Sequence, residues 1–214
     1  MKFMEMSGDY AEMGFLFWIF TQYMILWIYP STDDAEKIFF LALLMGFEFF
    51  MLGARIMFAG APFIAADQGI NAWWIFAGCL AFFGLFAFVF VIMAGNVYLI
   101  WIYAGLVISR LFQTFQYYNA GVSSGSMEAT TLMGPSALQM MLFFFIMMIV
   151  VFQHKHVPTL ALTQDFLQSI NYEKAVRIKG MLTEMPHVSM CFGALYYGLL
   201  FAGKFTKTIW RAFA

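Results

Sequence analysis

Four charged side chains interrupt long apolar runs of the sequence, and they are the residues best placed to do chemistry there. Glu48 lies in LALLMGFEFFMLGARIMF, Arg55 follows seven residues later, Arg110 lies in LVISRLFQ and Lys204 in LLFAGKFTK. We expect the three cations in the membrane half nearest the chain ends. There they could bind lipid phosphates, or each could extend independently to the membrane surface.

Glu48 carries the stronger functional indication. A carboxylate in the middle of a membrane helix costs about 2.5–3.5 kcal/mol on insertion scales, so such residues commonly have a function. A role in proton transfer is one interpretation; the other is a protonated or paired side chain that fixes helix packing. Arg55 is seven residues away, at about 10 Å of helical rise, which is too far for a simple ion pair.

Metal ligands are scarce in the apolar runs. His154, His156 and His187 fall in or beside a polar stretch, and Cys79 and Cys191 are isolated within apolar segments. A membrane haem needs axial ligands inside the spans, and copper needs clustered ligands. We therefore predict no haem, copper or other metal bound by this chain, and we find no nucleophile with a nearby base. The sequence favours a scaffold over a catalyst.

The composition indicates an integral membrane protein. Of 214 residues, 63% are hydrophobic and only 11% charged, about half the charge fraction of a soluble domain. Helices are expected because backbone groups in lipid must be satisfied within the segment. We predict an all-α, polytopic bundle forming a single transmembrane domain over 1–214. Runs of roughly 20 apolar residues place its six spans at about 11–30, 36–60, 71–94, 97–118, 132–153 and 189–212.

A polar loop at 154–188 separates the last two predicted spans. With Lys37, its side of the membrane carries five basic residues against three on the other side. The positive-inside rule then places the loop on the matrix or cytoplasmic side. The net charge of −1 excludes a broad basic surface for nucleic acid.

The stretch 111–140 gives a family resemblance. LFQTFQYYNAG, then VSSGSMEATTLM, then GPSALQM resembles subunit III of cytochrome c oxidase, with Ser136 and Gln139 standing where that family has histidines. Glu48 in FEFFMLGARIMF is similar to the family's intramembrane glutamate. The matching motif residues are Gln113, Tyr117, Tyr118, Ala120, Gly134 and Leu138.

The resemblance implies a non-redox core subunit of an aa3-type oxidase, although that family usually has seven spans. Such a subunit stabilises the catalytic subunit, binds phospholipid and supports proton uptake during oxygen reduction. Haem a and copper would be held by partner subunits I and II. The expected location is the mitochondrial inner membrane with the 154–188 loop in the matrix, or else a bacterial inner membrane.

Three other functions fit parts of the sequence. A small transporter or channel would use Glu48 and Arg110 along a path. A stator-type subunit of ATP synthase would use Arg110 and would need polar residues on a facing helix. A structural subunit of another respiratory complex would need neither residue.

Overall fold

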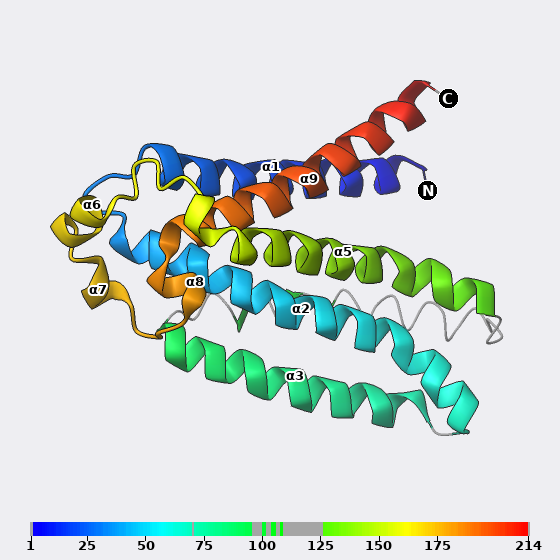
Figure 1. Ribbon diagram of the computed structural model, residues 1–214. Helices are drawn as coiled ribbons and strands as arrows, with labels where there is room; N and C mark the ends of the chain where they lie inside the picture. The colour runs from blue at the N-terminus through cyan, green and yellow to red at the C-terminus, as the bar shows by residue number, and fades with distance from the viewer. Residues whose placement is uncertain are drawn as a thin grey trace. The chain divides into compact units, whose positions relative to one another are not determined.

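The computed structural model describes residues 2–69, 71–95, 100–101, 104–105, 108 and 126–213, and within these residues every regular element is a helix (Figure 1). Five of the predicted spans fall on long helices. The remaining predicted span, at 97–118, lies largely outside the described residues. The long helices are α1 (Lys2–Ile28), α2 (Ala35–Gln68), α3 (Ala72–Ala94), α5 (Ser126–Phe152) and α9 (Pro186–Phe213).

Three of these helices contain stretches long and apolar enough to cross a membrane: Ala35–Phe58, Trp73–Ile92 and Pro186–Lys207. Helices α1 and α5 contain shorter apolar stretches, Glu12–Ile28 and Ala137–Phe152. The expectation of an all-helical chain with several membrane-length helices is therefore confirmed for the described residues. The count of six spans stays a prediction.

The chain divides into two compact units. Unit 1 comprises Met1–Met45 and Leu142–Ala214, and unit 2 comprises Gly46–Met141. Helices α2 and α5 each contribute residues to both units.

In unit 1, α1 and α9 lie side by side, and the short helices of the chain gather at the end opposite the two termini (Figure 1). The two helices approach closely at Gly193 of α9, where a Cβ would overlap the ring of Tyr23. That ring is fully buried and stacks on Tyr197 at 5.7 Å between centroids. Its hydroxyl donates a hydrogen bond of 2.8 Å to the carbonyl of Leu41 in α2. Glycine at 193 is thus what allows the two helices to meet.

Residues 153–185, which we term the loop cap, are folded and not extended. The indole of Trp27 donates to the carbonyl of Pro158 at 3.0 Å, and the Ala161 amide donates to the Trp27 carbonyl at 3.3 Å. The buried Tyr172 hydroxyl donates to the Thr183 carbonyl at 2.9 Å, and burial raises the pKa of this phenol. The cap contains η1 (His154–His156), α6 (Gln164–Ser169), α7 (Tyr172–Ala175) and α8 (Met181–Glu184).

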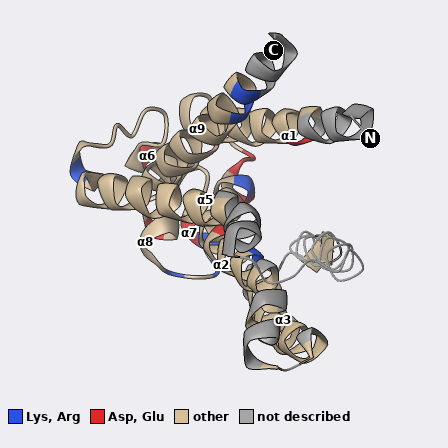
Figure 2. Ribbon diagram, turned by 90° about the vertical axis from the view of Figure 1, so that its right-hand side faces the viewer, with Lys and Arg blue, Asp and Glu red and all other residues tan. Residues whose placement is uncertain are grey.

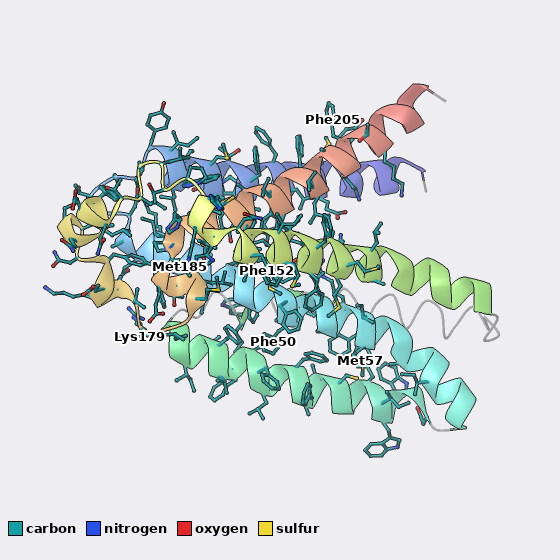
Figure 3. All side chains as sticks on the ribbon, in the orientation of Figure 1. Phe50, Met57, Phe152, Lys179, Met185 and Phe205 are labelled. Atoms are coloured by element: carbon teal, nitrogen blue, oxygen red, sulfur yellow. The ribbon has the colours of Figure 1, made fainter. Side chains whose placement is uncertain are left out.

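In unit 2, phenylalanine rings fill the space between α2 and α3. Phe50, labelled in Figure 3, stacks on Phe86 with centroids 5.1 Å apart. Phe58 stacks on Phe76 at 4.8 Å. Because these pairs run in opposite directions along the chain, the helices are antiparallel. Helix α3 is capped at its start by the side chain of Asn71.

At its other end α3 stops at Gly95. This residue adopts φ 62°, in the left-handed region, and its amide bonds to the Ile92 carbonyl at 3.3 Å. Glycine takes this conformation without the steric cost that a Cβ brings.

Candidate functional site

Arg55 and Gln139 form a polar contact inside unit 2. The Nη1 group of Arg55, on α2, donates a hydrogen bond of 3.3 Å to Oε1 of Gln139, on α5. Both side chains are half-buried. Among the described residues, no ion pair to Arg55 is present, so its recorded partner is a neutral amide. A guanidinium has five N–H groups, and one amide oxygen leaves most of them for another acceptor.

The depth of Arg55 can be measured along α3. This helix has 23 residues, or about 34 Å of rise, close to the thickness of a bilayer's hydrocarbon core. Phe83 is its middle residue, and a Cβ on Gly53 would lie 3.6 Å from Cε1 of that ring. Arg55 is two residues beyond Gly53, at about 3 Å of rise. Its backbone therefore lies about level with the middle of α3, and its depth in a membrane stays a prediction.

Glu48 lies on the same helix, five residues before Gly53 and so about 7.5 Å from the level of Phe83. Its side chain is half-buried and has interaction partners within the chain. Seven residues separate it from Arg55, so the two side chains are not brought into an ion pair. The functional interpretation of Glu48 stays a prediction.

Lys204 has a carboxylate partner that no sequence pattern indicates. Its Nζ lies 2.6 Å from Oε2 of Glu12 on α1, and the exposed fractions of the two side chains are 23% and 52%. The contact joins residues 192 positions apart, so no local pattern indicates it. The lipid-phosphate role predicted for Lys204 now has a competing partner within the chain.

Of the motif residues behind the family resemblance, two lie in described parts of α5. Gly134 is half-buried and Leu138 is 68% exposed, so Leu138 contributes little to the packing of this chain. The adjacent Gln139, which stands where the family that this stretch resembles has a histidine, is the residue that binds Arg55. The remaining predicted site residues lie outside the described residues: Arg110, Gln113, Tyr117, Tyr118 and Ala120.

His154 and His156 lie in the loop cap and His187 lies in the first turn of α9, so all three are in or beside the polar stretch, as expected. In His154, Nδ1 is 2.9 Å from the carbonyl of Val151. Across the described residues, no group of three or more His, Cys, Asp or Glu side chains is arranged to hold a metal ion. Binding of metal by partner proteins is a separate matter and stays a prediction.

A cluster around Asp34 closes the turn between α1 and α2. Its carboxylate accepts hydrogen bonds from the Ser31 amide at 2.7 Å, the Ser31 hydroxyl at 2.8 Å and Lys37 Nζ at 2.6 Å. Burial raises the pKa of this carboxyl, but the bonds from Lys37 and Ser31 outweigh it, so the pKa lies below its ordinary value. An aspartate directly before a helix is a common N-cap signal, which could have identified this site.

Charged residues are absent from α3, and its described part is uniformly uncharged in Figure 2.

No protein-family model, curated protein or solved structure matches this chain.

Proposed function

We propose that this chain is a multi-pass membrane protein that acts by packing against a partner membrane protein, as a non-redox subunit of the oxidase subunit III kind. The observation that carries the proposal is the exposure of α3. Its apolar window, Trp73–Ile92, has a mean hydropathy of 2.7, yet only 17% of it is buried within the chain. An apolar surface of this extent in a soluble protein would cause aggregation, so lipid or another membrane helix must cover it.

Large side chains make up this surface. Their exposed fractions include 75% for Trp74, 63% for Leu85 and 53% for Phe88. By contrast, 61% of the apolar window of α2 is buried within the chain. The difference supports a role for α2 in packing within the chain and a role for α3 in contacts with lipid or a partner helix.

The finer parts of the proposal rest on the resemblance in the stretch 111–140 and around Glu48. They are a location in the mitochondrial inner membrane, the 154–188 loop on the matrix side, phospholipid bound by this chain, and haem a and copper held in partner subunits. In this assembly the chain supports proton uptake and stabilises the catalytic subunit.

The proposal is tested on native membranes. Resistance to alkaline carbonate extraction would support membrane insertion. The tagged chain is then purified in a mild detergent, and a reduced-minus-oxidised spectrum is recorded together with cytochrome c oxidation. An a-type haem signal that co-purifies in fixed ratio supports the oxidase subunit. A preparation that contains partner subunits but no haem contradicts the oxidase form and leaves the packing role; a chain purified alone contradicts both.

A further inference from the structure

Arg55 is the feature of unit 2 that the proposed function leaves unexplained. Arg55 lies level with the middle of α3, and its partner among the described residues is the neutral Gln139 amide. A cation at that depth is stabilised when an anion and further hydrogen-bond acceptors surround it. The question is which anion completes the site.

A lipid phosphate fits this depth poorly. The hydrocarbon core extends about 15 Å from its middle to either surface, which is longer than an arginine side chain. The hydrogen bond to Gln139 also holds the guanidinium at its own level and so opposes extension toward the surface. Lys204, by contrast, lies in the last turns of α9 and already has the Glu12 carboxylate.

The one carboxylate of unit 2 whose side chain the structure describes, Glu48, does not reach Arg55 either. Glu48 is two helical turns away, at about 10 Å of rise. Helix α3 contains no charged residue. Within the described part of unit 2, the Arg55 site therefore contains hydrogen-bond donors and one neutral acceptor, and it lacks an anion.

We propose that Arg55, positioned by Gln139, is the docking point for a transmembrane helix of a partner protein that carries an Asp or Glu at mid-depth. The inference rests on the proposed packing function and adds the chemistry of the contact. A carboxylate can accept two parallel N–H bonds from a guanidinium, an arrangement that fixes register as well as strength. Polar contacts between helices in lipid also select the partner, because an unmatched charge there is costly.

The most direct test supplies the missing carboxylate from within the chain. In Q139E, the new carboxylate stands where the amide oxygen is 3.3 Å from Arg55 Nη1, and it neutralises the guanidinium without any partner. The full-length chain is purified from native membranes in mild detergent, and the partner is identified and quantified by mass spectrometry. We expect Q139E to raise the unfolding temperature of the chain while partner recovery falls about tenfold or more.

Three further variants keep the test decisive. R55Q should also lose the partner, whereas R55K, which keeps the charge, should retain an intermediate amount. R177Q makes the same chemical change at an exposed arginine of the loop cap and should leave recovery unchanged. If R55Q fails to accumulate, Q139E and R55K still decide the question. Exchange of the charges, R55E with Arg at the partner's acidic position, should restore recovery.

Several results would overturn the docking site. One is unchanged partner recovery in Q139E and R55Q. Another is a partner without an intramembrane carboxylate, or a second copy of this chain as the only companion. A third is loss of phospholipid phosphorus per chain while partner recovery is unchanged, which would assign Arg55 to lipid. Where a foreign partner is still recovered, the proposed function survives. A second copy as the only companion, or a wild-type chain that purifies alone, ends both proposals.

Discussion

Helices of the two units meet in different ways. In unit 1, Gly193 lets α9 approach α1 until the Tyr23 ring fills the contact, and the tyrosine hydroxyl is satisfied by a backbone carbonyl. In unit 2, stacked phenylalanine rings such as Phe50 and Phe86 stand between α2 and α3. Unit 1 also pairs Lys204 with a carboxylate, whereas Arg55 of unit 2 has an amide.

In unit 1 the chain itself supplies every group of the contact. In unit 2 the Arg55 guanidinium still has N–H groups for another molecule to bind. Close approach at a small residue and satisfied polar groups are how membrane helices associate without a hydrophobic driving force. Unit 1 has both features. Unit 2 has aromatic packing and a cation whose charge remains to be balanced, which is the pattern expected where a partner contributes to the structure.

The largest expected effect is at the close approach in unit 1. G193A places a methyl group into the Tyr23 ring and should lower the free energy of unfolding by about 3 kcal/mol, the upper end of the usual cost of overpacking. Thermal unfolding in detergent measures it. G203A is the matched control, because a Cβ there meets nothing within 4 Å. Equal unfolding temperatures for the two variants would show that α1 and α9 do not meet at Gly193.

Next in size is the amide of unit 2. Q139L removes the acceptor from Arg55 and leaves a half-buried guanidinium without it, so the free energy of unfolding should fall by about 2 kcal/mol. The neighbouring M141L, at a side chain that is 70% exposed, serves as the control for a change on α5. If Q139L unfolds at the wild-type temperature, the 3.3 Å contact contributes nothing to the free energy of unfolding. The contrast with the polar contacts of unit 1 would then no longer hold.

A smaller effect is expected for the tyrosine hydroxyl. Y23F keeps the ring in the glycine notch but removes the bond to the Leu41 carbonyl, at a cost of about 1 kcal/mol. The matched control is Y29F, because Tyr29 is 79% exposed. The unfolding temperature of Y23F should fall and that of Y29F should not. The reverse order would show that the bond from Tyr23 to the Leu41 carbonyl does not stabilise unit 1.

The smallest effect concerns the turn at Asp34 and depends on pH. The folded-state pKa of this carboxyl lies below its ordinary value of 3.8, so its contribution is present above that pH and is lost as pH falls through the folded pKa. Wild type should therefore be more stable than D34N at neutral pH, with the gap closing below about pH 4. Unfolding temperatures across this range measure the gap. A gap that does not change with pH would assign the effect to shape instead of charge.

Long apolar runs made the major helices predictable, since an amide in lipid has few alternatives to helix. The short helices of the loop cap were not predicted, because elements of four to six residues depend on tertiary contacts. One local signal was present: Thr163 caps α6 by accepting a bond from the Phe166 amide at 3.3 Å.

The site was predictable only in part. Arg55, Glu48 and Lys204 stand out in the sequence because charges are rare in apolar runs. Their partners do not, because Gln139 and Glu12 lie 84 and 192 residues away and neither spacing nor composition connects them. By sequence, Gln139 is distinguished only by standing where the similar family has a histidine, and its contact with Arg55 gives that position a role of its own.

The turn between α1 and α2 has a consequence for how the chain is made. Its bonds from Ser31 and Lys37 to Asp34 join residues three positions apart, and Tyr23 reaches Leu41 without help from any later segment. These contacts can all form once the first two helices have been synthesised. In a membrane, the pair could therefore insert together as a hairpin, with the tyrosine hydroxyl already satisfied. The Tyr23 ring would then be in place for Gly193, synthesised some 150 residues later, to pack against it.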